Sequence, residues 1–199
     1  MTGITISSQQ YDYARVKIQE AGLSSKVQIK LKDYRHIGGI FDKIVSIEMI
    51  EAVGHKFLPA FFRILQQRLK KDGLLGLQMI LSPDHRYRSF RKNVDWIQKH
   101  IFPGSLLPSM SAVQASISRT GSLNLFSFED ITPSYVKTLS IWQDNFNAHL
   151  DKVRVLGFDE AFIRKWNYYL SYCAAAFNMR NISVAQAIFT RPNNLQIRS

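Results

Sequence analysis

Cysteine is nearly absent from this sequence, and so are long hydrophobic runs. Cys173 is the only cysteine in 199 residues, which excludes a disulfide within the chain and fits a reducing compartment. It lies in an apolar helical stretch, residues 172–177, which favours a buried thiol over a nucleophile. No apolar run reaches the roughly 18 residues of a membrane span, and the first residues lack the regions of a secretory signal. We expect a cytoplasmic protein whose contact with a membrane is peripheral.

Acidic residues are also scarce: 15 stand against 26 lysines and arginines, which gives a net charge of +11. The densest basic run, residues 85–92, mixes cations with aromatic rings and predicts an anionic partner. Lipid headgroups and nucleic acid both fit such charge, but the sequence has no RNA-binding sheet motif, zinc-finger spacing or helix-turn-helix. We predict an anionic membrane surface as the partner of Arg86, Arg88, Arg91 and Lys92, and no nucleic acid. A solvated basic face is the alternative.

The hydrophobic pattern alternates strands and helices, and 46% hydrophobic residues predict one globular α/β domain across residues 1–199. The expected strands are Gly3–Ile6, Val27–Leu31, Asp42–Ile47, Leu74–Ile80, Leu123–Phe128 and Ser183–Phe189. The expected helices are Ser8–Ala21, capped by Ser7 or Ser8, then Phe57–Leu69, Ser111–Thr120, Tyr135–Leu150 and Asp159–Phe177, with a turn at Lys71–Gly73 and a tail from Arg191.

Residues 82–110, approximately, interrupt this alternation. The segment is rich in proline, aromatic and basic residues and is too long for an ordinary connection between a strand and a helix. Insertions that follow the carboxyl end of a strand are more often functional than decorative. We therefore expect a helical insertion that lies over an active site.

Two carboxylates, Glu48 and Glu51, follow the strand at Asp42–Ile47 directly. Ligands of open α/β sheets bind outside the carboxyl ends of the strands. Residues three apart share a face of a helical turn, and two carboxylates in a dry pocket do not both ionise readily. At least one of them is a candidate site residue. The alternative is a glutamate that complements the dipole of a helix start.

Several segments in one order and spacing resemble the cyclopropane-fatty-acyl-phospholipid synthases, a branch of the S-adenosylmethionine (SAM) dependent methyltransferases that includes the mycolic acid cyclopropane synthases. The matching residues are 2–7 with Gln10, 33–35, 41–46 through Gly54, 101–104 with 107–109, Tyr135 with Thr138, Leu139 and Trp142, and 168–170 with Cys173 and Phe177. The resemblance implies a Rossmann-like methyltransferase sheet. It also implies methyl transfer from SAM to the double bond of an unsaturated acyl chain of a phospholipid, followed by proton loss and closure of a cyclopropane.

The resemblance assigns site residues by position. Glu51 corresponds to the glutamate that holds a bound bicarbonate, which is the family's base. Tyr169 corresponds to a tyrosine ligand of that bicarbonate, and Ile80 to a position whose backbone contributes. Gln78 stands where some members carry histidine. Thr5, Gln10, Asp33 and Tyr34 match positions that contact SAM, the last two through its adenine. For Tyr169 the alternative is a core aromatic beside Trp166, and no metal site is assigned.

The sequence departs from the family pattern at its amino terminus. The family's helical cover over the cofactor, its first strand, its glycine loop and a cysteine ligand of the bicarbonate have no counterpart. We therefore expect an N-terminally incomplete methyltransferase domain with an exposed apolar strand edge and weak SAM binding, unless a second copy of the chain completes it. The alternative function is that of a truncated, non-catalytic remnant that binds anionic membrane surfaces.

Overall fold

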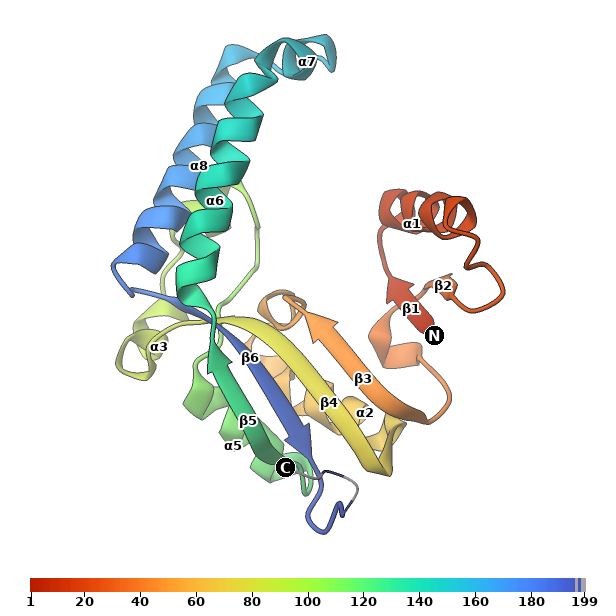
Figure 1. Ribbon diagram of the computed structural model, residues 1–199. Helices are drawn as coiled ribbons and strands as arrows, with labels where there is room; N and C mark the ends of the chain where they lie inside the picture. The colour runs from red at the N-terminus through yellow and green to blue at the C-terminus, as the bar shows by residue number, and fades with distance from the viewer. Residues whose placement is uncertain (196, 198–199) are drawn as a thin grey trace. The chain divides into compact units, whose positions relative to one another are not determined.

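The computed structural model describes residues 1–195 and residue 197. It divides into two compact units, Met1–Ile40 and Phe41–Ser199, each with its own sheet (Figure 1). The sequence predicts a single domain across both, and that remains a prediction. The α/β class is confirmed, because strands and helices alternate along most of the chain.

The first unit is a small βαβ arrangement. Strands β1 (Thr2–Thr5) and β2 (Gln28–Leu31) pair in parallel, and α1 (Ser8–Glu20) connects them. Ser7 caps α1 by accepting a hydrogen bond from the backbone N–H of Gln10 at 3.3 Å, so the earlier of the two candidate caps is the one used. The sequence predicted all three elements to within two residues.

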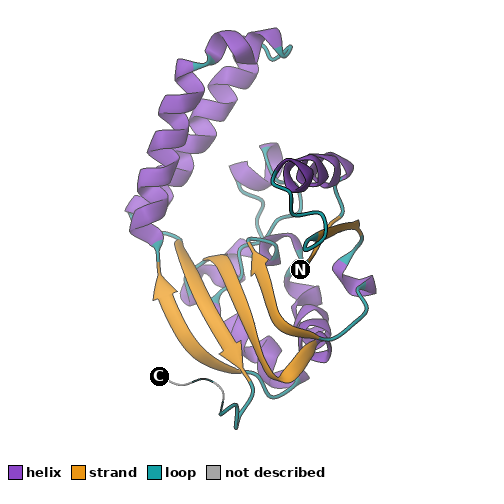
Figure 2. Ribbon diagram, turned by 45° about the vertical axis from the view of Figure 1, so that its right-hand side comes forward, coloured by secondary structure: helices purple, strands orange, loops and turns teal. Residues whose placement is uncertain are grey.

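The second unit holds a four-stranded sheet in the order β3–β4–β6–β5 (Figure 2). The strands are β3 (Phe41–Ile47), β4 (Leu69–Leu81), β5 (Asn124–Asp130) and β6 (Ser183–Thr190). Strand β3 runs parallel to β4, whereas β6 is antiparallel to both β4 and β5. The carboxyl ends of β3 and β4 therefore meet at the same edge of the sheet, which is where α/β sheets bind ligands.

Helices α2 (Leu58–Arg68) and α5 (Met110–Thr120) cover one face of this sheet. Phe61 and Phe62 of α2 and Val113 of α5 are fully buried, and so are Leu75 and Met79 of β4, because alternate strand residues point to the covered face. Burial of such side chains contributes roughly 1.5–3 kcal/mol each. This layer fixes the ends of β3 and β4 that carry the candidate site.

Helices α6 (Thr132–Ala148) and α8 (Glu160–Asn178) form a long hairpin with the short α7 (Leu150–Val155) at its far end (Figure 1). Leu139, Leu170 and Phe177 form a buried cluster with Val184 of β6, which ties the base of the hairpin to the sheet. The sequence predicted both long helices. It missed α7, because a helix of six residues, three of them charged, is too short to show a clear helical period.

The insertion is helical, as expected, with α3 (Asp84–Phe90) and α4 (Trp96–His100). The predicted turn at Lys71–Gly73 is wrong, because these residues lie inside β4. Leu69 pairs with Phe41 and Leu74 pairs with Lys43, so the register shifts between the two pairs and the intervening residues form an irregularity within the strand. Strand pairing on both sides of the segment overrides its local turn preference.

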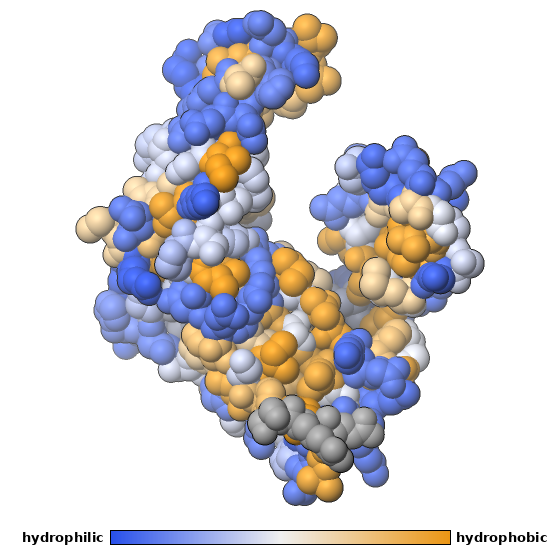
Figure 3. All heavy atoms as spheres, viewed as in Figure 1, coloured by the Kyte–Doolittle hydropathy of each residue, from blue (hydrophilic) through white to orange (hydrophobic). Residues whose placement is uncertain are grey.

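Strand β3 lies at one edge of the described sheet. Its Val45 and Ile47 side chains are 69% and 58% exposed, and Phe126 and Phe128 of β5 are exposed at the opposite edge. Figure 3 shows hydrophobic residues gathered over the face of the sheet that is turned to the viewer. The exposed apolar strand edge that the sequence predicts is therefore present at β3. Among the described residues, no helix is long and apolar enough to cross a membrane.

Candidate active site at the carboxyl ends of β3 and β4

Glu51 is buried in the short 3-10 helix Ile50–Ala52, directly after β3, with 8% of its surface exposed. Its Oε1 accepts a hydrogen bond from the backbone N–H of Ile80 at 2.6 Å. Its own carbonyl accepts one from the N–H of Leu106, which brings the insertion against it at 2.8 Å. The other carboxyl oxygen, Oε2, is buried with no partner among the described residues. A buried oxygen of this kind calls for a hydrogen-bonding group.

Burial sets the protonation of Glu51. Removal of the carboxylate from water raises its pKa to about 7, although the Ile80 N–H stabilises the charged form. The nearby charge of Glu48 raises it further. Near neutral pH the side chain therefore exists in both forms, and such a group can exchange a proton with a neighbouring molecule.

Gln78 of β4 lies at the centre of a polar network. Its Nε2 donates to Glu48 Oε1 at 2.9 Å and to the Tyr135 hydroxyl at 3.2 Å, and its Oε1 accepts from Gln186 Nε2 at 2.9 Å. The N–H of Glu48 also donates to the Gln78 carbonyl at 2.9 Å. Both hydrogens of the Gln78 amide are engaged, so the structure fixes its orientation.

The backbone at Glu48 is unusual, because its φ is 50° and few residues other than glycine adopt that region. Strain of this kind collects at functional sites, where it aims side chains that a regular turn would direct elsewhere. Here it points the Glu48 carboxylate at Gln78. The sequence offered Glu48 and Glu51 as a pair of which one is a candidate site residue, and the structure brings both to the same edge of the sheet.

Tyr169 of α8 lies in an aromatic wall. Its ring meets Phe102 of the insertion at 5.9 Å and Trp166 at 5.1 Å between centroids. Burial raises the pKa of its hydroxyl, and the charges of Cys173 and Glu48 raise it further. Tyr169 therefore packs as a core aromatic does, and its hydroxyl also lies within reach of the Glu48 charge.

Cys173 behaves as the sequence predicts. It is half-buried one helical turn after Tyr169, and burial raises the pKa of its thiol to about 12. A thiol with so high a pKa carries almost no thiolate at neutral pH and is a poor nucleophile.

Two residues of the network were missed. Tyr135 was recognised only as part of the family pattern, and Gln186 was not singled out. Gln186 is the one amide in the apolar strand β6, and a polar residue within such a strand is the signal that could have found it. Tyr135 packs its ring on Phe177 at 5.4 Å while its hydroxyl accepts from Gln78.

The four residues assigned to SAM all belong to the first unit. Thr5 closes β1, and its hydroxyl donates to Gln10 Oε1 at 2.7 Å. Asp33 follows β2 and accepts from the guanidinium of Arg35 at 2.6 and 2.9 Å, which lowers its pKa to about 2 and keeps it ionised. Tyr34 begins the 3-10 helix Tyr34–His36 and is half-buried. These side chains gather at the carboxyl ends of two parallel strands.

The basic residues Arg86, Arg88, Arg91 and Lys92 are all exposed on or beside α3. The structure does not bring them together on one face. Arg88, Arg91 and Lys92 line a cavity, whereas Arg86 donates to Asn181 Oδ1 at 3.0 Å on another side of the helix. Among the described residues no cluster of side chains could hold a metal ion.

Known proteins resemble this chain in sequence and in fold. The family model for mycolic acid cyclopropane synthetase matches residues 1–187. The chain belongs to this family. Tuberculostearic acid methyltransferase UfaA1 of Mycobacterium tuberculosis is 39% identical to this family member over 92% of the chain and 43% of that protein. Cyclopropane-fatty-acyl-phospholipid synthase of Escherichia coli K12 is 34% identical over 96% of the chain and 47% of that protein. The chain spans about half the length of these curated relatives.

Solved structures confirm the methyltransferase fold of this mycolic acid cyclopropane synthetase family member. Mycolic acid cyclopropane synthase CmaA1, complexed with SAH and CTAB, matches with a TM-score of 0.86 and 26% identity, over 96% of this chain and 69% of that one. The cyclopropane synthase MmaA2 from Mycobacterium tuberculosis has a TM-score of 0.85 and 24% identity over the same shares. The predicted fold class is therefore confirmed.

Proposed function

We propose that the protein represented by this chain transfers a methyl group from SAM to the double bond of an unsaturated acyl chain of a phospholipid and closes a cyclopropane ring. Family membership supports the reaction class. The observation that carries the assignment is Glu51, a buried carboxyl with a pKa of about 7 and one oxygen without a partner among the described residues. Such a group suits a site in which a proton must be lost.

Aromatic rings of the insertion and of α8 suit the positive charge of this reaction. The intermediate is a carbocation, which water would capture before the ring closes. Phe102, Tyr169 and Trp166 form an apolar wall, and aromatic faces attract cations by roughly 0.5–2 kcal/mol each. We propose that these rings stabilise the developing charge. Glu48 adds a negative charge on the same side.

The residues present fit a small oxyacid such as bicarbonate. Glu51 Oε2 has an unsatisfied site for an O–H donor, and the Tyr169 hydroxyl can donate to an anion. When bound, bicarbonate would supply the base that accepts the proton. The Ile80 N–H holds Glu51 at 2.6 Å and the Gln78 amide is engaged by Glu48 and Tyr135, so we propose that these two residues position the carboxylates.

The first unit would hold SAM. Asp33 offers an ionised acceptor to the amino and hydroxyl groups of an adenosine, and Tyr34 an aromatic ring to its base. Thr5 and Gln10 add polar atoms at the end of β1. When bound, SAM supplies the methyl group.

We propose that the protein works at the inner face of the cytoplasmic membrane, where its substrate lies. The net charge of +11 and the exposed cations Arg86, Arg88, Arg91 and Lys92 support attraction to anionic lipid. A homodimer is a further proposal, and light scattering of the purified chain tests it. The alternative function is a non-catalytic chain that only adheres to membranes.

Incubation of the chain with SAM and vesicles of unsaturated phosphatidylglycerol tests the proposal, with mass spectrometry of the released fatty acids. A fatty acid that has gained the mass of one methylene group and does not take up hydrogen on hydrogenation supports the proposal, because a ring has no double bond. If a folded chain binds SAM in calorimetry and yields no such product, the non-catalytic alternative holds. Failure to bind SAM leads to the same conclusion for the chain in isolation.

A further inference from the structure

A cavity of about 520 Å³ opens beside α3, at the edge of the sheet where β4 ends. Six side chains that define it come from two segments, and we call it the cationic pocket: His55, Asp84, Tyr87, Arg88, Arg91 and Lys92. The start of α5 completes its wall with Ser109 and Ser111. Drug-sized and headgroup-sized ligands occupy cavities of roughly 300–1,000 Å³, so the pocket is larger than a bare ion requires.

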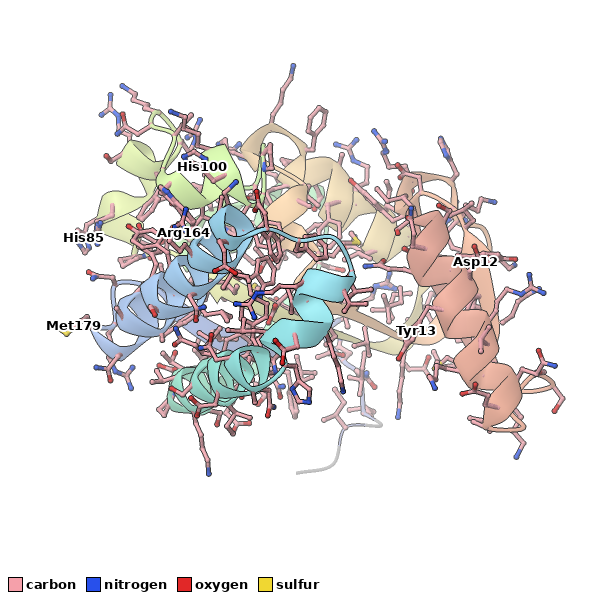
Figure 4. All side chains as sticks on the ribbon, turned by 90° about the horizontal axis from the view of Figure 1, so that it is seen from above. Asp12, Tyr13, His85, His100, Arg164 and Met179 are labelled. Atoms are coloured by element: carbon pink, nitrogen blue, oxygen red, sulfur yellow. The ribbon has the colours of Figure 1, made fainter. Side chains whose placement is uncertain are left out.

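The spacing along α3 explains why the basic run divides. Asp84, Tyr87, Arg88 and Arg91 follow the i, i+3, i+4, i+7 pattern and share one face, which lines the pocket. Arg86 lies on another face, where its guanidinium sits 5.2 Å over the ring of Phe90 and donates to Asn181. The exposed side chain of His85, its neighbour in the chain, points outward (Figure 4).

Tyr87 and His55 contact each other in the lining of the pocket. The ring of Tyr87 is buried with 8% exposure, and its hydroxyl lies 2.8 Å from His55 Nδ1. The two rings meet edge to face at 5.5 Å, and Arg91 stands over Tyr87 with its Cζ 5.8 Å from the ring centroid. The aromatic face is therefore covered, and a nucleobase has no ring to stack on in this pocket.

The lining of the pocket carries more positive than negative charge. Arg88, Arg91 and Lys92 make no ion pair among the described residues. Asp84 is the only carboxylate of the lining, and its Oδ1 accepts from the N–H of Ser111 at 3.1 Å. That bond ties α3 to the start of α5 and directs the carboxylate to the wall. Burial is the main cause that lowers the pKa of His55, and the nearby Arg91 and Arg119 lower it further.

We propose that the cationic pocket binds a phosphate ester through Arg88, Arg91 and Lys92. Guanidinium groups match the paired oxygens of a phosphate, and a lysine adds a mobile point charge. The cavity volume leaves room for the alcohol that the phosphate carries. The ester is the phosphate of a glycerophospholipid headgroup or of a small soluble molecule. The lipid source rests on the proposed function, whereas phosphate binding itself does not.

Calorimetric titration with sn-glycerol 3-phosphate and with inorganic phosphate tests the pocket. We expect saturable binding of glycerol 3-phosphate, and tighter than that of phosphate. Arg88→Gln and Arg91→Gln should each weaken it by about tenfold or more, since each removes charge-assisted hydrogen bonds to the phosphate. Lys99→Gln is the control, because it removes an exposed charge from α4 of the same insertion outside the pocket and should change the affinity by less than about twofold.

Two results would overturn the proposal: no binding of either phosphate, or equal losses in the Lys99, Arg88 and Arg91 variants. Thermal melting of each variant distinguishes a lost contact from a lost fold.

A competition experiment identifies the source of the phosphate ester. If glycerol 3-phosphate displaces the chain from phosphatidylglycerol vesicles, the pocket binds the headgroup; if it binds without displacement, the ligand is a soluble ester. Both outcomes support phosphate-ester binding by the cationic pocket. Neither depends on product formation, so a failed synthase assay would not contradict this proposal.

Discussion

Two polar sites follow neighbouring strands of the same sheet, and the Glu51 carboxyl of one is buried whereas the cations of the other are exposed. Glu51, after β3, is buried, and the loss of water raises its pKa to about 7. The cations of α3, after β4, are exposed, and among the described residues they make no ion pair. Burial thus turns one site into a proton-exchanging group, whereas exposure leaves the other as a fixed positive charge. The first suits chemistry and the second suits binding.

Replacement of Glu51 should have the largest effect, and it should act on product formation and not on phosphate-ester binding. Glu51→Gln keeps an oxygen for the Ile80 N–H but removes the titrating carboxyl. We expect product formation to fall on the order of a thousandfold, within the range of lost acid–base groups, while glycerol 3-phosphate binding stays unchanged. Mass spectrometry and calorimetry measure the two effects. Glu129→Gln, on exposed β5, is the control. An equal loss in the control would contradict the assignment.

The free energy of unfolding should depend on pH because of the buried Glu51 carboxyl. The folded pKa of Glu51, about 7, exceeds its ordinary value of 4.5, so between these values the folded state binds more protons than the unfolded state. Its contribution to the free energy of unfolding therefore falls as pH rises through this window, by on the order of 3 kcal/mol. Urea unfolding at pH 4 and pH 8 should show this loss in the native chain relative to Glu51→Gln. Parallel pH profiles for the two proteins would refute it.

The network around Gln78 should contribute less. Tyr135→Phe removes the hydroxyl that accepts from Gln78 and keeps the ring on Phe177. We expect a loss of about 1 kcal/mol in the free energy of unfolding, typical of one hydrogen bond. Tyr135→Ala, which also removes the ring, should cost roughly 3–5 kcal/mol. Similar losses in the two variants would mean that the hydroxyl, and not the ring, holds the hairpin to the sheet.

Salt should have the smallest effect, and it should act on one site only. Raising sodium chloride from 50 to 200 mM screens exposed charges, so we expect glycerol 3-phosphate binding to weaken about threefold. The pH midpoint of the Glu51 contribution to stability should move little, because burial causes it. A midpoint that shifts as much as the binding does would show that Glu51 is exposed to solvent.

Local pattern determined most of the secondary structure. Ser7 caps α1, and the period of the apolar residues placed both helices of the α6–α8 hairpin. It failed at Lys71–Gly73, where turn-forming residues lie within β4 because β3 and β6 pair with the strand on both sides. Local preference is weak by comparison with strand pairing that comes from distant parts of the chain.

The sequence by itself determined the family, the charge and the identity of Glu51, because these depend on which residues are present and in what order. Only the tertiary structure decided that Glu51 Oε2 lacks a partner among the described residues and that Tyr135 and Gln186 hold Gln78. It also divided one basic run into a pocket and an outer face. The partners of Gln78 lie 57 and 108 positions away in the chain, and no local pattern contains that information.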